Sequence, residues 1–191
     1  MFIDRIVTLL SALKPLKVQA HCDTAEGPAV KDGRTALETG NINYALKWIA
    51  AGGEAELRGV FERALRTRTL GAEAAELADR LFLETLVRIH RMGEGVGFNG
   101  IQPVGTEVDP VVKAADQAIA VGSDADLLPM VPQERRAELA NRFRAALAIK
   151  GFDVDDVPAA RRYVAAYVDF FKYAEGEDDE HHAHAGHAHK H

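Results

Sequence analysis

The feature of this sequence that most constrains its fold is an internal repeat, which relates residues 24–95 to residues 106–176. The segment Gly27-Pro28-Ala29-Val30-Lys31 recurs as Asp109-Pro110-Val111-Val112-Lys113. Identical residues then recur 82 positions apart through both copies: Ala36 and Ala118, Gly40 and Gly122, Leu57 and Leu139, Phe61 and Phe143, Leu65 and Leu147. This constant separation predicts that both copies adopt one fold and pack together.

Each copy has the pattern of a helical unit. Pro28 and Pro110 suit a first helical turn, and Gly40 and Gly122 suit a left-handed stop at the end of that helix. Two longer segments with helical periodicity follow in each copy, namely 54–69 and 73–92, then 133–150 and 156–174. Few segments alternate with a period of two, so almost no sheet is expected. The sequence therefore predicts an all-α protein, a helical bundle built from two pseudo-repeated units.

The apolar positions of both copies predict a shared core in which the units face each other. The first unit contributes Leu57, Phe61, Leu65, Leu77, Leu81, Leu86 and Ile89, and the second contributes Leu139, Phe143, Leu147, Tyr163, Tyr167 and Phe170. The predicted organisation is a leader (1–20), repeat one (21–95), a glycine-rich linker (96–108), repeat two (109–176) and an acidic, histidine-rich tail expected to be disordered (177–191).

The leader has two interpretations. Ile3, Ile6, Leu10 and Leu13 form one stripe of an amphipathic helix, which would dock on the body or on a second subunit in a homo-oligomer. The residues before His21 also resemble a signal-peptide cleavage site. The charges that flank the apolar run favour a retained leader and a cytoplasmic protein, whereas cleavage before His21 would mean export. The run is too short to span a membrane.

Composition excludes several classes of function. The chain has 191 residues, is 47% hydrophobic and carries a formal charge of -6, which is typical of a globular protein rather than one that binds nucleic acid. Its single cysteine rules out an intrachain disulfide framework. Phosphate-binding loops, dinucleotide fingerprints and the common hydrolase motifs are absent from the sequence.

Metal chemistry is the chemistry that the sequence favours. His21, Cys22 and Asp23 place an imidazole, a thiol and a carboxylate on consecutive residues. His90 lies near the end of a predicted helix with Glu94 four residues later, so Glu94 can act as a ligand or orient the imidazole. In the second copy, the positions of His21, Cys22 and His90 hold Pro103, Val104 and Phe171. The first copy is therefore equipped for chemistry where the second is filled with apolar residues.

These residues predict a metal site built from His21, Cys22 and His90, completed or oriented by Glu94 or Glu84. Glu84 is the weaker candidate, because it lies about 120° around the helix from His90 and has Arg88 available as an ion-pair partner. The mixed donor set does not distinguish nickel, copper, iron and zinc. The alternatives are that Cys22 is a small buried apolar residue and that His90 is only a hydrogen-bonded core residue.

Three segments carry a resemblance to a known family. They are the runs that begin at His21 (HCDT, then GPAV), at Ala36 (ALETGNIN) and at Glu84 (ETLVRIHRMGEG). They resemble an uncharacterised bacterial family, a domain of unknown function, and the family implies no activity. His21-Cys22-Asp23 also resembles the start of the metal hook of nickel superoxide dismutase, a helical-bundle enzyme. Glu26 stands where that enzyme has its second cysteine, so its nickel dithiolate cannot form here.

The sequence thus predicts a metal-binding helical protein with redox or reactive-oxygen chemistry at a thiolate- and imidazole-bound transition metal. One alternative is a non-catalytic protein for metal storage, sensing or delivery, which the six histidines of the tail favour. The other is a metal-free structural or interaction module.

Overall fold

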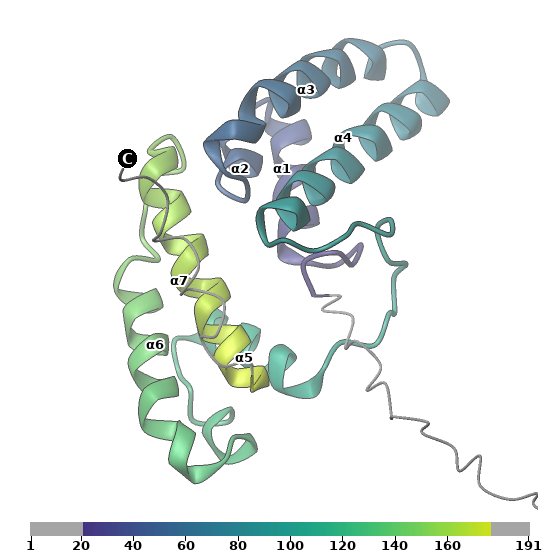
Figure 1. The fold of residues 1–191 in the computed structure, drawn as a ribbon. Coiled ribbons are helices and arrows are strands. Elements are labelled where there is room, and N and C mark those ends of the chain that lie inside the picture. Colours follow the sequence, from purple (N-terminus) through teal and green to yellow (C-terminus); the bar gives the residue numbers. More distant parts are fainter. Residues whose placement is uncertain (1–20, 177–191) are drawn as a thin grey trace, which may run out of the picture.

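The computed structural model describes residues 21–176, and this part of the chain is all-α, with seven α-helices and no strands. The predicted helical bundle is confirmed (Figure 1). The helices are α1 (Pro28–Thr39), α2 (Asn43–Leu46), α3 (Glu54–Arg68), α4 (Ala72–Gly93), α5 (Pro110–Val121), α6 (Arg136–Ala148) and α7 (Val157–Glu175). Three short 3₁₀ turns join them: η1 (Ala51–Gly53), η2 (Leu128–Met130) and η3 (Gln133–Arg135).

The helices fall into two groups of similar design (Figure 1). In the first group α3 and α4 form a hairpin and α1 packs on α4; in the second, α6 and α7 form a hairpin and α5 packs on α7. Helices α1 and α5 each have 12 residues and a proline in the first turn. They end at Gly40 (φ 70°) and Gly122 (φ 76°), where the left-handed backbone favours glycine. These matched elements are what the repeat predicts; the duplication itself stays a prediction.

The core differs from the expected one in how the two groups pack. Buried apolar residues of both groups form one continuous cluster, but the long helices pack within their own group. Phe61 of α3 contacts Phe82 of α4 at a ring-centroid distance of 5.2 Å, and Phe143 of α6 contacts Phe170 of α7 at 5.6 Å. The prediction that the long helices of one unit face those of the other is therefore wrong.

Two predicted core residues are on the surface. Leu77 is 70% exposed and Leu81 is 58% exposed, whereas Leu57, Phe61, Leu86 and Ile89 are buried as predicted. The inward face of α4 is instead formed by Ala78, Phe82 and Leu86, which are four residues apart. Leu77 and Leu81 each lie one position before this stripe, and a step of about 100° per residue carries them out toward solvent.

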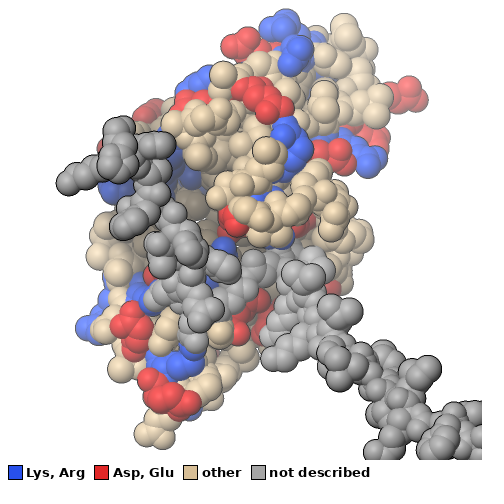
Figure 2. All heavy atoms as spheres, viewed as in Figure 1, with Lys and Arg blue, Asp and Glu red and all other residues tan. Residues whose placement is uncertain are grey.

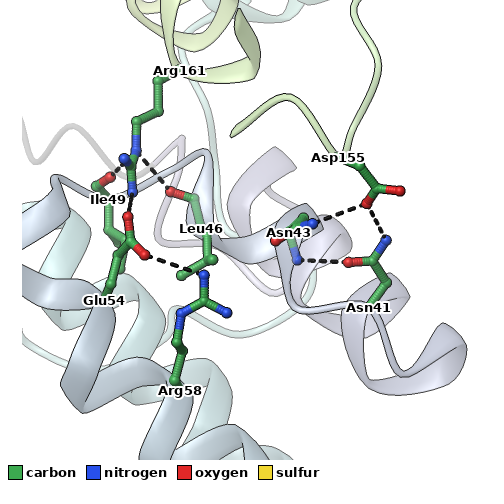
Figure 3. Close-up of polar contacts among 8 residues, drawn as sticks. All are labelled: Asn41, Asn43, Leu46, Ile49, Glu54, Arg58, Asp155 and Arg161. Carbon is green, nitrogen blue, oxygen red and sulfur yellow. Dashed lines mark hydrogen bonds and ion pairs between the residues drawn. The ribbon is translucent and has the colours of Figure 1, made fainter. Parts of the chain in front are cut away.

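Polar contacts tie the two groups together (Figure 3). Arg161 of α7 donates from Nε to the carbonyl oxygens of Leu46 (3.3 Å) and Ile49 (2.8 Å), and from Nη2 to Glu54 Oε1 (2.7 Å). Beside this contact, Asp155 Oδ1 accepts a hydrogen bond of 2.9 Å from the side-chain amide of Asn41 and another of 2.9 Å from that of Asn43. The interface between the groups is therefore fixed at its edge by charged and amide side chains.

The segment between α4 and α5 is pinned to the start of the described chain. Gln102 donates its backbone N–H to the carbonyl of Asp23 (2.8 Å), and its own carbonyl accepts from the N–H of Ala25 (2.9 Å). This pairing, which includes an isolated bridge between Thr24 and Gln102, holds residues 21–25 against the body. None of the helices in residues 21–176 combines the length and apolar character that crossing a membrane needs.

The predictions for the leader and the tail fall on residues 1–20 and 177–191, which lie outside the described residues. On the face shown in Figure 2, acidic and basic side chains are interspersed, and neither sign dominates a large area.

Candidate functional site

The run His21-Cys22-Asp23-Thr24 is buried rather than exposed, with each residue at most 8% accessible. It forms a tight turn before α1, in which Thr24 Oγ1 donates to the carbonyl of His21 (3.3 Å) and the N–H of Gly27 donates to the carbonyl of Thr24 (2.9 Å). A Cβ added at Gly27 would lie 2.3 Å from the carbonyl oxygen of His21. Only glycine permits so close an approach, so Gly27 shapes the turn that carries the polar residues.

His21 reaches across to the second group of helices. Its Nε2 lies 3.0 and 3.1 Å from the two carboxylate oxygens of Asp116 on α5, and 2.9 Å from the hydroxyl of Tyr167 on α7. Tyr167 also donates its hydroxyl proton to Asp116. Burial, the charge of Asp116 and this hydrogen bond raise the pKa of Tyr167 above its ordinary value, so the phenol stays protonated. The ring of Phe171 packs edge-on against His21, with a centroid distance of 5.3 Å.

His90 is held in one tautomer by the backbone. Its Nδ1 lies 2.8 Å from the carbonyl oxygen of Trp48, which can only accept, so Nδ1 carries the proton. Burial lowers the pKa of His90, and the neutral ring then has a lone pair on Nε2. This Nε2 is buried, has no hydrogen-bond partner and lies 3.7 Å from Glu94 Oε2, which is too far for a hydrogen bond.

Glu94 is the C-cap residue of α4 and forms ion pairs with two basic side chains. Lys172 of α7 places its Nζ 2.9 Å from Glu94 Oε1, and Arg91 places Nη1 3.4 Å from Oε2. The same guanidinium reaches Asp23, with Nε 3.2 Å from Oδ2. Burial raises the pKa of Asp23 to about 6, against the opposing effect of Arg91. The carboxylates of both residues are thus held by buried or half-buried cations.

Cys22 is 4% exposed and belongs to the continuous apolar core. Burial, and then the negative charges of Glu94, Asp23 and Asp116, raise the pKa of its thiol well above the ordinary value. The thiol is therefore protonated near neutral pH and shielded from solvent. Its polar neighbours His21 and Asp23 are buried with it, because Asp116 and Arg91 give these two residues partners inside the protein.

We call this set the buried cluster. It comprises His21, Cys22, Asp23, Trp48, His90, Arg91, Glu94, Asp116, Tyr167 and Lys172. Four of the five residues predicted for the metal site belong to it. Within residues 21–176, no three His, Cys, Asp or Glu side chains are arranged closely enough to hold a metal ion as they stand.

Comparison with known proteins gives a family without an assigned activity. A family model described as a family of unknown function, DUF6448, matches residues 26–173. The chain belongs to this family. No curated protein and no solved structure matches it. The resemblance to an uncharacterised family is thus confirmed, and the likeness to nickel superoxide dismutase has no support beyond its three residues.

The region that DUF6448 covers contains most of the buried cluster but begins after its first three residues. His90, Glu94 and Asp116 lie inside the matched region, whereas His21 and Cys22 precede it. The family match therefore gives no information about the residues that carry the thiol and the first imidazole. Their place in the site rests on the contacts described above.

Glu84 lies apart from the cluster. Its carboxylate pairs with Arg80 (2.9 Å), not with the predicted Arg88, which pairs with Glu56 instead. Glu84 lines a cleft of about 420 Å³ between α1, α3 and α4, and no residue of the buried cluster lines this cleft. The structure therefore brings His21, Cys22, His90 and Glu94 into one cluster and leaves Glu84 outside it.

Sequence reasoning missed the partners that come from the second group, above all Asp116 and Lys172. A signal for Asp116 does exist in the sequence. It lies four residues after Val112 and three before Ile119, so it is a lone carboxylate on the apolar face of α5. A half-buried carboxylate at such a position needs a partner, and His21 and Tyr167 provide it.

Proposed function

We propose that this protein binds one transition-metal ion in the buried cluster, with His90 Nε2 as the first donor and Glu94, Cys22 and His21 as the other ligand candidates. The observation that carries the proposal is the lone pair of His90, which is buried, has no hydrogen-bond partner and faces a carboxylate. Leaving such a polar atom unsatisfied in the interior is costly. A bound cation between Nε2 and Oε2 would remove that cost.

The spacing of these two atoms supports the proposal. Two ligand atoms that lie 2.0–2.2 Å from one tetrahedral ion are about 3.3–3.6 Å apart. The separation of 3.7 Å between His90 Nε2 and Glu94 Oε2 is close to this range and longer than a hydrogen bond. The pair thus needs only a small adjustment to share an ion.

The orientation of both histidines also supports it. A histidine that binds a metal usually donates its other ring N–H to a carboxylate or a carbonyl. His90 does so to the carbonyl of Trp48 through Nδ1, and His21 contacts Asp116 through Nε2. His90 would then bind the ion through Nε2 and His21 through Nδ1. Rearrangement of the turn before α1 would be needed to bring Cys22 and His21 into the same coordination sphere.

The donor types point to nickel, copper, iron or zinc, because a thiolate and imidazoles select borderline and soft ions over calcium or magnesium. Redox or reactive-oxygen chemistry at a thiolate-bound ion is the catalytic form of the proposal, and storage, sensing or delivery is the non-catalytic form. Turnover of superoxide or peroxide by the metal-loaded chain separates the two forms. Tight binding without turnover would leave the non-catalytic form.

The experiment uses the single cysteine as a reporter. Because Cys22 is the only thiol, a thiolate-to-metal charge-transfer band on titration with Co(II), Ni(II) or Cu(II) reports the buried cluster and not the histidine-rich tail. We expect a band in the full chain, its loss in Cys22→Ser, and weaker binding in His90→Asn and in Glu94→Gln. The matched control is Glu84→Gln, which removes the same charge from the same helix outside the cluster. Absence of any band in the unaltered chain, together with an unchanged affinity for these ions in His90→Asn, would refute the proposal.

The metal-free structural module is favoured by one observation, the complete hydrogen bonding of His21 Nε2 with Asp116 and Tyr167. Under that interpretation these contacts only join the two groups of helices. His90→Asn would then leave the affinity for every ion unchanged while lowering the free energy of unfolding.

A further inference from the structure

We infer that Lys172 is a tethered counter-cation, which holds Glu94 while the proposed metal site is empty and competes with the ion for this carboxylate. This inference rests on the proposed function and concerns how that same site is regulated. It gives the protein a built-in competitor for the metal ion, supplied by the second group of helices.

The contacts of Glu94 carry the argument. Its Oε1 is occupied by the ammonium of Lys172 at 2.9 Å, and its Oε2 lies 3.4 Å from Arg91 Nη1 and 3.7 Å from His90 Nε2. An ion on Oε2 would therefore lie about 5 Å from the ammonium, where like charges repel strongly even at the effective dielectric constant of a protein surface. Coordination through both carboxylate oxygens would require Lys172 to leave altogether.

Lys172 rather than Arg91 is the cation that can move. The side chain of Arg91 is 5% exposed and also binds Asp23, so it is fixed inside the protein. The side chain of Lys172 is 28% exposed, and its flexible stem allows the ammonium to turn into water. In the empty site, Glu94 thus keeps a mobile partner on one oxygen and a buried one on the other.

The exchange would couple the ion to the relation between the helix groups. Lys172 lies on α7, and Glu94 is the residue immediately after the end of α4. Their ion pair is therefore one of the ties between the two groups of helices. Displacement of Lys172 by the ion would break this tie and replace it with a bond inside the first group, between Glu94 and His90. Metal occupancy would thereby be sensed as the loss of one tie between α7 and the first group.

The test is Lys172→Met in the full chain, followed by titration with Co(II) against a chelator and detection of the charge-transfer band of Cys22. Removing the competing charge should raise the affinity for Co(II) at least about tenfold. Lys172→Arg keeps the charge and should stay close to the unaltered chain. Lys113→Met is the matched control, because it removes an exposed lysine from α5 and changes the net charge equally.

The outcomes separate this inference from the proposed function. Equal affinities for Co(II) in the unaltered chain and in Lys172→Met, both measured from the charge-transfer band, would overturn the inference. The proposed metal site would be unaffected by that result. An equal gain in Lys172→Met and Lys113→Met would also overturn it, since net charge alone would explain the result. Absence of the band in every variant would defeat the proposed function and this inference with it.

Discussion

Arg161→Met is the substitution that should most directly loosen the two groups of helices (Figure 3). The guanidinium donates to the carbonyl oxygens of Leu46 and Ile49 and pairs with Glu54. Methionine keeps the length and the apolar stem of the side chain but removes every donor. Leu46 and Ile49 are almost fully buried, so their carbonyl groups would lose a partner where water has little access.

The cost can be worked from these contacts. Hydrogen bonds to charged groups contribute about 1.5–3 kcal/mol each when buried, and less where water competes. Arg161 is 25% exposed at its side chain and Glu54 is 26% exposed, and Glu54 keeps Arg58 as a second partner at 3.2 Å. We therefore expect Arg161→Met to lower the free energy of unfolding by roughly 2–4 kcal/mol, most of it from the two carbonyl groups.

Part of this cost should depend on pH. The hydrogen bond from Arg161, and secondarily that from Arg58, lowers the pKa of Glu54 in the folded protein. A carboxyl group whose pKa is lowered by folding stabilises the protein above its unfolded pKa, about 4.3 for glutamate, and loses this effect as the pH falls through the folded value. The difference between the unaltered chain and Arg161→Met should thus shrink below about pH 4. It should not vanish, because the carbonyl groups accept at any pH.

Urea unfolding followed by the fluorescence of Trp48 is a suitable assay. Trp48 is the only tryptophan and contacts the ring of Tyr167 in the second group at 6.2 Å between centroids. The matched control is Arg162→Met, the same change at the exposed neighbouring position of α7. Equal unfolding free energies for the two variants would refute the assignment of Arg161 as the tie between the groups.

Three further predictions follow from burial and close packing. Cys22 should resist alkylation in the native chain and react fully in urea, as mass spectrometry will show; rapid native modification would contradict its burial and raised pKa. Gly27→Ala should destabilise the chain by about 2 kcal/mol or more in denaturant titrations, because the new Cβ meets the fixed carbonyl of His21. Leu77→Gln and Leu81→Gln should each change the unfolding free energy by at most about 0.5 kcal/mol, and a loss typical of a core residue would show that these positions are covered.

The ends of the helices were predictable because their signals are local. Pro28 and Pro110 open the first helix of each unit, and Gly40 and Gly122 close it, since proline and a left-handed glycine act within one turn. Local signals do not predict which face of α4 is buried. Leu77 is apolar and suits a core position by residue type, but it lies one position before the stripe of α4 that is buried, and the adjacent Ala78 is covered in its place. Which stripe is buried depends on the neighbours of α4, and these come from distant sequence.

The candidate site likewise has one part that local sequence spacing predicts and another part that it does not. His90 and Glu94 lie four residues apart on one helix end, and sequence spacing is enough to bring them together. The contacts from His21 to Asp116 and from Glu94 to Lys172 join the two groups of helices. No local pattern encodes such pairs, because they depend on how the second unit is placed against the first.

The two groups of helices also differ in a way that the predicted repeat alone does not explain. The alignment pairs His90 with Phe171, and it suggested a second site filled by apolar residues. Phe171 packs its ring against His21; Tyr167, one helical turn earlier on α7, contacts His21, and Lys172, the next residue, contacts Glu94. The second group of helices therefore contributes a wall of the one cluster, with an aromatic surface, a hydroxyl and an ammonium. His90 and Phe171, which the alignment pairs, thus both lie at the same cluster: His90 donates to the Trp48 carbonyl, and Phe171 packs on His21.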